Sequence, residues 1–126
     1  STVMVKDNHW QALRAAGRTL ATALDEARGL GVADLQVEVE TLAQVEEAAR
    51  AGATRLLVDN QSPATVAAWA ERAWQLRPEI RIEATGGITL ENLRAYADAG
   101  ADFISTGMLT HSVRSVDIGL EVTEDR

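Results

Sequence analysis

Apolar residues in this chain alternate between short continuous runs and helical spacing, and this alternation constrains the fold more than any other feature. Short runs bounded by turn residues predict strands, and apolar residues at every third or fourth position predict helices. Strands that alternate with helices are typical of an α/β fold built on a parallel sheet. The predicted strands are Thr2–Lys6, Leu35–Glu40, Arg55–Val58, Arg81–Ala84, Phe103–Ser105 and a last short one at Gly119–Val122.

Four helices are predicted between these strands. The first is one long helix whose single apolar stripe runs from Trp10 to Ala27, and it ends near Gly29 and Gly31. Each of the other three begins at a residue that can cap a helix and ends at a glycine or before a proline. The second helix opens with Thr41 and Gln44 placed as a capping box and ends at Ala51–Gly52. The third is capped by Ser62 and stops before Pro78, and the fourth runs from about Leu90 to Ala99, with Thr89 as its cap and Gly100 as its stop.

Composition limits the chemistry that the chain can perform. With 126 residues it forms at most one domain, and with no cysteine it has neither disulfides nor thiolate metal ligands. Its net charge of −7 argues against binding to nucleic acid, which needs a basic surface. No apolar run is long enough to cross a bilayer, and Ser1–Asn8 does not resemble a signal peptide. A cytoplasmic chain without membrane contact is therefore expected.

Polar residues and glycines gather where the predicted strands end. In parallel α/β folds the reactive groups lie at the carboxyl ends of the strands. Glycine turns there expose backbone N–H groups that bind phosphate, whereas carboxylates interact with hydroxyls, a cationic centre or magnesium. A ribose phosphate that develops positive charge would satisfy both. The successive strand ends carry Lys6-Asp7-Asn8-His9, Glu38 and Glu40, Asp59-Asn60, Thr85-Gly86-Gly87, and Thr106-Gly107.

Each of these signals, taken singly, also has a purely structural explanation. The alternation of valine and glutamate from Val37 to Glu40 also occurs in a solvated edge strand. Asp59 can cap a turn, Lys6 can form a surface ion pair with Asp7, and paired glycines are common in tight turns. Their coincidence at successive strand ends favours a binding site.

Five segments of the chain resemble, in order and spacing, the motifs of quinolinate phosphoribosyltransferases. These segments are Val5–His9, Val37–Glu40, Leu57–Asn60, Glu83–Ile88 and Gly107–Ser112. The resemblance implies that residues 1–126 are the C-terminal portion of an incomplete β/α (TIM-like) barrel. It also implies a homodimer and a reaction in which the quinolinate nitrogen displaces pyrophosphate from magnesium-bound phosphoribosyl pyrophosphate. Loss of the 2-carboxylate then gives nicotinate mononucleotide, a step of NAD biosynthesis.

The resemblance also implies roles for single residues. Lys6 would contact anionic groups of the substrates, while Glu38 and Asp59 would hold the ribose hydroxyls and the substrate-bound magnesium beside the reacting carbon. Thr85 stands where the family usually has serine and keeps the hydroxyl, whereas Met108 replaces the usual alanine with a larger side chain. The 5′-phosphate would be held by Thr85, Gly86, Gly87, Gly107, Met108 and Leu109, with His111 nearby.

In the family the arginine-rich quinolinate pocket, the N-terminal sandwich domain and the first part of the barrel all precede the segment that begins at Lys6. The chain is therefore expected to be a fragment, a truncated chain or one piece of a split protein, without quinolinate affinity of its own. To cover its open strands it would self-associate, bind the N-terminal half, or flatten into a sheet of flavodoxin-like order.

Two other classes share part of this pattern. A response-regulator receiver domain has a similar length and alternation, with Asp59 as its phospho-acceptor. It needs an acidic pair after its first strand and a lysine after its fifth, where this chain has Lys6-Asp7 and Gly107-Met108-Leu109. A non-catalytic phosphate-binding half-barrel would need the glycine turns but neither Glu38 nor Asp59.

Overall fold

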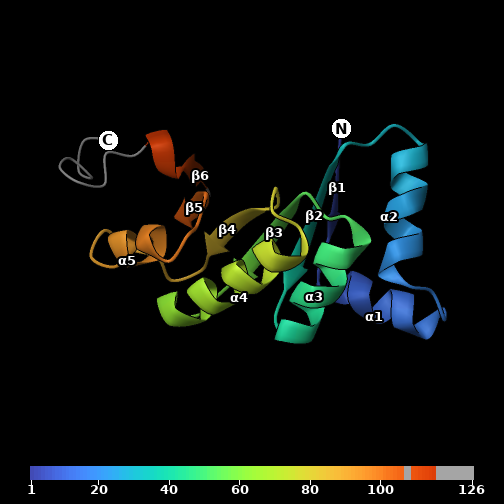
Figure 1. Ribbon diagram of the computed structural model, residues 1–126, viewed down its shortest axis with the longest axis horizontal. Helices are drawn as coiled ribbons and strands as arrows, with labels where there is room; N and C mark the ends of the chain where they lie inside the picture. Colours follow the sequence, from blue (N-terminus) through green and yellow to red (C-terminus); the bar gives the residue numbers. More distant parts are fainter. Residues whose placement is uncertain (107–108, 116–126) are drawn as a thin grey trace.

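The computed structural model describes residues 1–106 and 109–115. Figure 1 shows α3, α4 and α5 along one side of the sheet. The predicted strands up to β5 are confirmed, each within one residue at either end. In chain order the elements are β1 (Thr2–Val5), α1 (Asp7–Ala15), α2 (Leu20–Gly29), β2 (Asp34–Val39), α3 (Leu42–Ala51), β3 (Arg55–Asp59), α4 (Pro63–Leu76), β4 (Arg81–Thr85), α5 (Leu93–Asp98), β5 (Phe103–Thr106), β6 (Leu109–Ser112) and the 3-10 helix η1 (Val113–Ser115).

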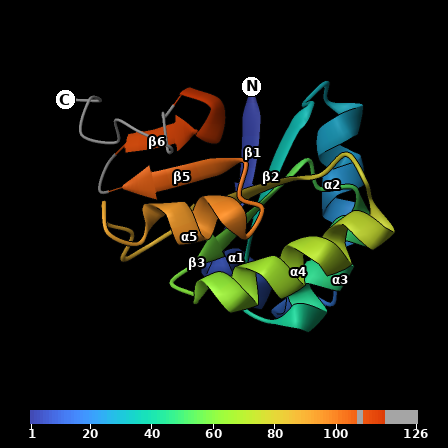
Figure 2. The same cartoon turned by 60° about the vertical axis from the view of Figure 1, so that its left-hand side comes forward.

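The strands lie in the sheet in the same order as in the chain, from β1 to β6. Strands β1 to β5 are parallel to their neighbours, and β6 returns antiparallel beside β5 (Figure 2). This consecutive order is that of a β/α-barrel segment, so the predicted portion of a TIM-like barrel is confirmed. In a receiver domain, or in any flavodoxin-like sheet, the second strand lies outside the first. The receiver alternative and the flattening into a flavodoxin-like order are therefore wrong.

The two faces of the sheet differ in polarity. Along each strand, apolar side chains that pack against the helices alternate with side chains on the opposite face, which we call the open face and which carries most of the polar residues. The open face carries Gln36, Glu38, Arg55 and Glu83. The alternation of valine and glutamate noted in the sequence thus places Glu38 on the face opposite Val37 and Val39. The helix-covered face is apolar and buried, with Leu35, Val37, Val39, Leu56, Val58, Ile82, Ala84 and Ile104.

The predicted single long first helix is wrong, because the chain divides it into α1 and α2. Gly17 adopts a left-handed backbone with φ of 67°, which ends the first helix. Thr19 then caps α2, and its side chain accepts a hydrogen bond from the N–H of Thr22 at 3.1 Å. The burial that the apolar stripe predicted is nevertheless observed for Trp10 in α1 and Leu24 in α2.

The caps predicted for α3 and α4 are confirmed. The Thr41 hydroxyl accepts from the N–H of Gln44 at 3.1 Å, and the Ser62 hydroxyl accepts from the N–H of Thr65 at 3.2 Å. The Gln44 side chain reaches one residue further back than the predicted capping box, since its Oε1 accepts from the N–H of Glu40 at 2.7 Å. This bond ties the chain after β2 to α3.

Two further differences concern the end of the chain. The last predicted strand, Gly119–Val122, lies outside the described residues. Strand β6 was not predicted, and it pairs with β5 from Thr106 opposite Leu109 to Phe103 opposite Ser112. Within residues 1–106 and 109–115, no helix is both long enough and apolar enough to span a membrane.

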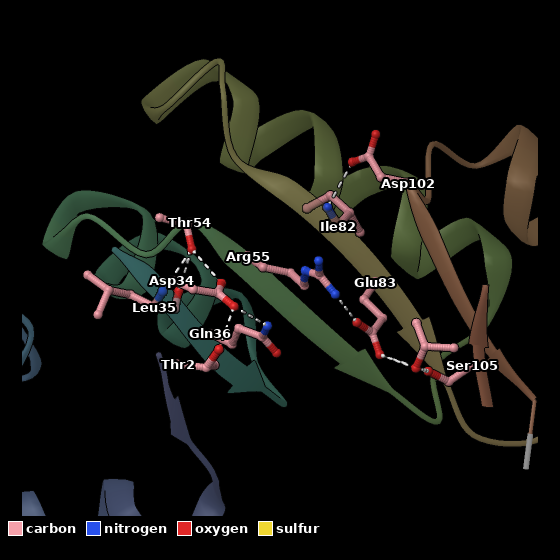
Figure 3. Close-up of polar contacts among 11 residues, drawn as sticks. Thr2, Asp34, Leu35, Gln36, Thr54, Arg55, Ile82, Glu83, Asp102 and Ser105 are labelled. Atoms are coloured by element: carbon pink, nitrogen blue, oxygen red, sulfur yellow. Dashed lines mark hydrogen bonds and ion pairs between the residues drawn. The ribbon is translucent and has the colours of Figure 1, made fainter. Parts of the chain in front are cut away.

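A polar cluster lies where β2 begins, at the end of the sheet opposite the predicted site. The Asp34 carboxylate accepts hydrogen bonds from Thr2 at 2.8 Å, Gln36 at 3.0 Å and Thr54 at 3.3 Å (Figure 3). Burial, the largest single influence, raises the pKa of Asp34, but these three bonds and the charge of Arg55 outweigh it and leave the pKa below its ordinary value. We call Thr2, Asp34, Gln36 and Thr54 the Asp34 cluster.

Folding stability is therefore expected to fall in acid partly through Asp34. A carboxyl whose pKa is lower in the folded chain stabilises the fold above its unfolded pKa of about 4 and loses this contribution as the pH falls through the lowered value. Asp34→Asn should lower the melting temperature at pH 7 and flatten its decline between roughly pH 5 and pH 2. Thermal unfolding of both proteins across this range checks the prediction, and parallel pH profiles would contradict it.

Candidate functional site

Strand register brings four of the predicted site residues to the carboxyl end of the sheet. Val5 and its partner on β2 form the last pair between β1 and β2, so Lys6 and Glu38 follow one position beyond it. Asp59 pairs with Thr85, and each is the last residue of its strand. The convergence expected from the sequence is therefore present in the backbone of β1 to β4.

Helix α1 fixes the position of Glu38. The indole Nε1–H of the buried Trp10 donates to the backbone oxygen of Glu38 at 2.8 Å. The backbone N–H of Asp7, in the first turn of α1, donates to the Glu38 carboxylate at 3.4 Å. The N–H of the exposed Lys6 donates to Nδ1 of His9 at 2.9 Å, which closes the same turn. The start of α1 is thus folded against the end of β2, with Lys6 at the junction.

Asp59 is held by the next strand. The Thr85 hydroxyl donates to Oδ1 of Asp59 at 2.6 Å, a short bond to a carboxylate. A bond of this kind orients the carboxylate and restricts its rotation. The sequence placed Thr85 only in the phosphate cradle, and the structure gives its hydroxyl this second partner.

Gly86 packs directly against Asp59. Its φ is 80°, in the left-handed region, and a Cβ atom built there would lie 2.8 Å from Oδ1 of Asp59 and 3.1 Å from the nitrogen of Asn60. Asn60 itself has a φ of 58°, and its N–H donates to the carbonyl of Thr85 at 2.9 Å. The turns after β3 and β4 therefore form one closely packed unit in which only glycine fits at position 86.

The turn after β4 continues into a loop that Asn92 holds. The Asn92 side chain accepts from the N–H of Thr89 at 2.7 Å and donates to the carbonyl of Gly87 at 3.1 Å. Helix α5 begins only at Leu93, so the predicted helix from Leu90 with a Thr89 cap is wrong. Because a helix dipole acts within its first turn, α5 contributes little at the glycine pair. A phosphate there would depend on the backbone N–H groups of the turn.

Four carboxylates lie near one another at this end of the sheet. The pKa of the exposed Glu40 is raised, above all by the charge of Asp7, with smaller contributions that include the charges of Glu38 and Asp59. Among the residues that the structure describes, no group of three or more acidic or histidine side chains is placed to hold a metal ion. A magnesium ion that keeps phosphate and water ligands needs only one or two protein carboxylates, so such an ion does not require a ready-made group of three.

The remaining predicted phosphate ligands lie on or before β6. Leu109 begins this strand and is exposed, and His111 pairs with Ile104. Directly opposed residues of an antiparallel pair share a face, so His111 lies on the side of the buried Ile104, whereas Thr110 lies on the open face. The described structure does not bring Leu109 or His111 to the open face, and their contact with phosphate stays a prediction. Outside the described residues lie Gly107 and Met108.

Some residues that shape the site were not predicted to do so. Asn92 precedes α5 and holds the loop before it, although its side chain makes no capping bond to the helix. The Tyr96 hydroxyl donates to the carbonyl of Gln61 at 2.6 Å and so ties the loop after β3 to α5. That bond, like the bond from Trp10 to Glu38, joins distant segments and has no local signature.

The consecutive parallel strands define a β/α-barrel segment. Its carboxyl end has carboxylates at two strand ends and a glycine turn packed beside them. A family model described as quinolinate phosphoribosyl transferase, C-terminal domain, matches residues 1–121. The chain belongs to this family, and the resemblance read from the five motifs is confirmed.

Named relatives and solved structures agree with this assignment. The chain is 42% identical over 123 residues to a probable nicotinate-nucleotide pyrophosphorylase [carboxylating] of Bacillus subtilis, covering 96% of this chain and 40% of that protein. It is 39% identical over 122 residues to the human nicotinate-nucleotide pyrophosphorylase [carboxylating], covering 95% of this chain and 40% of that protein. The solved nicotinate-nucleotide pyrophosphorylase of Francisella tularensis superposes with a TM-score of 0.69 at 31% identity, covering 84% of this chain and 36% of that one. The chain therefore spans well under half the length of these relatives.

Proposed function

We propose that this domain, within a longer protein like its relatives, transfers a phosphoribosyl group from phosphoribosyl pyrophosphate to quinolinate and yields nicotinate mononucleotide. The observation that carries the proposal is the packing of Asp59 against the Thr85-Gly86 turn, with Glu38 on the neighbouring strand. This arrangement offers carboxylates to a ribose and a backbone turn to its phosphate. A non-catalytic phosphate-binding half-barrel would need the turn alone, so the two carboxylates favour a catalyst.

In the proposed reaction the quinolinate nitrogen attacks the anomeric carbon while pyrophosphate leaves, and positive charge develops on the ribose. Glu38 and Asp59 bind the ribose hydroxyls, and their negative charges stabilise the positive charge that develops on the ribose. The Thr85 hydroxyl keeps Asp59 oriented, and Lys6 neutralises anionic groups of the substrates. The 2-carboxylate then leaves as carbon dioxide, and a proton takes its place on the ring carbon.

Magnesium is proposed to enter the site with phosphoribosyl pyrophosphate. When bound, it neutralises the phosphate groups and assists departure of pyrophosphate. Glu38 and Asp59 would contact it through the substrate or through water, since neither belongs to a ready-made metal cage within the described residues. The negative charges of Asp7, Glu38 and Asp59, which raise the pKa of Glu40, favour a cation at this position.

Quinolinate recognition is proposed to come from residues outside 1–126. Within the described chain, Arg55 of β3 forms an ion pair with Glu83, and Nη1 of Arg81 on β4 lies 3.6 Å from Oδ1 of Asp102. Neither is at the carboxyl end of its strand. A homodimer and a cytoplasmic location are further parts of the proposal and rest on the family resemblance.

Turnover by the longer protein and by residues 1–126 tests the proposal. With quinolinate, phosphoribosyl pyrophosphate and magnesium, the longer protein is expected to form nicotinate mononucleotide, and residues 1–126 alone are expected to form none. Chromatographic detection of the nucleotide checks both, and addition of a chelator should abolish the signal. Absence of product from the longer protein would overturn the function, and product from residues 1–126 would overturn the dependence on outside residues.

A further inference from the structure

A buried carboxylate on the open face joins its own strand to three others. Glu83 of β4 is only 5% exposed, and its Oε1 accepts from Nη1 of Arg55 on β3 at 2.8 Å. Its Oε2 accepts from the hydroxyl of Ser105 on β5 at 2.7 Å and from that of Thr110 on β6 at 3.5 Å. The two hydroxyls are themselves 2.7 Å apart. We call Glu83, Arg55, Ser105 and Thr110 the Glu83 network, and Figure 3 shows Arg55, Glu83 and Ser105 of this set.

The Glu83 network is rigidly supported. The guanidinium carbon of Arg55 lies 3.7 Å from the ring centroid of Phe103, so the arginine is held between an aromatic face and a carboxylate. Every buried side-chain nitrogen and oxygen atom of the described residues has a hydrogen-bond partner. A satisfied buried network of this kind fixes its members in one arrangement. The proposed reaction does not use the Glu83 network. The sequence motifs contain Glu83 and Thr110 but predicted no role for either.

The position of the network shows what it can control. Backbone pairing between β4 and β5 runs from Glu83 opposite Phe103 to Ala84 opposite Ile104. Ser105 follows one position beyond that last pair on β5, and its hydroxyl reaches back to the Glu83 carboxylate, which adds a side-chain link between the two strands. Two residues after Glu83 on the same strand is Thr85, which orients Asp59 and opens the glycine turn.

We infer that Glu83 is a positioning residue that sets the spacing between the Thr85–Gly87 turn and the β5–β6 hairpin. It does so by binding Ser105 and Thr110, one on each strand of the hairpin, while Arg55 fixes its other oxygen. This inference rests on the proposed function, because it assigns the affinity for phosphoribosyl pyrophosphate to that spacing. The Glu83 carboxylate itself touches no reacting atom.

Ser105→Ala in the longer protein is the first test, because it cuts the link to the hairpin without removing a buried charge. The Michaelis constant for phosphoribosyl pyrophosphate is expected to rise about tenfold, the effect of one lost or misplaced hydrogen bond to a charged group. The Michaelis constant for quinolinate and kcat should change less than about twofold, because the hairpin is proposed to contact only the phosphorylated substrate. Ser105→Thr retains the hydroxyl and should restore the affinity.

Glu83→Gln tests the same link from the other side. It keeps the size of the side chain but leaves Arg55 without its counter-charge, so the affinity for phosphoribosyl pyrophosphate should fall at least as much as in Ser105→Ala. Hydrogen exchange of the β5 and β6 amides should also become faster. Asp34→Asn is the matched control, because it disrupts a comparable polar cluster at the far end of the same sheet. It should lower the melting temperature without changing either Michaelis constant.

The outcomes separate the inference from the proposed function. If Ser105→Ala and Glu83→Gln lower the melting temperature as Asp34→Asn does but leave the affinity for phosphoribosyl pyrophosphate unchanged, the network only stabilises the sheet and the inference is wrong. If the longer protein forms no product, that result refutes the proposed function. The inference can still be tested in that case, because calorimetry measures the affinity for phosphoribosyl pyrophosphate without turnover. A longer protein that does not bind phosphoribosyl pyrophosphate at all would refute both.

Discussion

Asp59→Asn in the longer protein is expected to lower kcat/KM for nucleotide formation by about 10²-fold or more, because it removes a preorganised charge beside a cationic transition state. Asparagine keeps the shape of the side chain and can still accept the 2.6 Å hydrogen bond from Thr85, so the turn after β4 should remain in place. The melting temperature should therefore change little. Steady-state kinetics and thermal unfolding of the same preparations measure both quantities.

Glu38→Gln should have a similar effect on the rate by the same reasoning. Its backbone oxygen would still accept from Trp10, so the variant should keep the position of α1. Asp98→Asn on α5 and Glu79→Gln before β4 are the matched controls, since each makes the same change of charge at an exposed carboxylate away from the site. Both controls should keep normal turnover. Near-normal kcat/KM in Asp59→Asn or Glu38→Gln would show that the carboxylate concerned has no such role.

The strands and their polarity were predictable because the pattern is local. Alternation along β2 predicted which of its side chains face the helices and which face away, and the structure shows Val37 and Val39 buried with Glu38 on the open face. Consecutive strand order was not readable from the alternation alone, because a receiver-like sheet has the same series of elements. The five motifs, rather than the periodicity, carried the distinction.

Errors in the helices arose where a strong signal concealed a weaker one. The apolar stripe of the first helical segment continues through Gly17, and that stripe outweighed the signal of a glycine followed by the cap Thr19. Both signals were correct, since the buried positions and the break coexist. In α5 the predicted start is wrong, because the Asn92 side chain bonds back to Thr89 and Gly87 and holds residues 87–92 as a loop, so the helix begins only at Leu93.

The links within the site could not be predicted from sequence, because they depend on register. Thr85 and Asp59 are 26 residues apart, and Glu83 and Ser105 are 22 apart. A one-residue slip between strands would move each of these side chains to the opposite face. The spacing of the motifs identifies the residues that belong to the site. The strand register then decides which hydroxyl donates a hydrogen bond to which carboxylate.

Gly86→Val is expected to disrupt both halves of the candidate site at once. The left-handed backbone, with φ of 80°, is unfavourable for a β-branched residue by roughly 1–2 kcal/mol. In addition, the new Cβ would lie 2.8 Å from the Asp59 carboxylate, so the turn or Asp59 must move. Affinity for phosphoribosyl pyrophosphate should fall more than about tenfold, and kcat should fall as well, because a displacement of about 1 Å at a reacting group is costly.

Gly31→Val separates backbone strain from collision with Asp59. Gly31 has a φ of 88°, close to that of Gly86, but a Cβ there would meet no atom within 4 Å. Both variants should therefore lose stability through the backbone, and only Gly86→Val should also lose substrate affinity. Calorimetric titration with phosphoribosyl pyrophosphate and thermal unfolding of both variants distinguish these effects. A valine side chain at position 86 would keep a phosphate away from the backbone N–H groups of this turn. Unaltered affinity in Gly86→Val would therefore mean that the glycine pair serves only as a turn and that the phosphate binds elsewhere at the carboxyl end of the sheet.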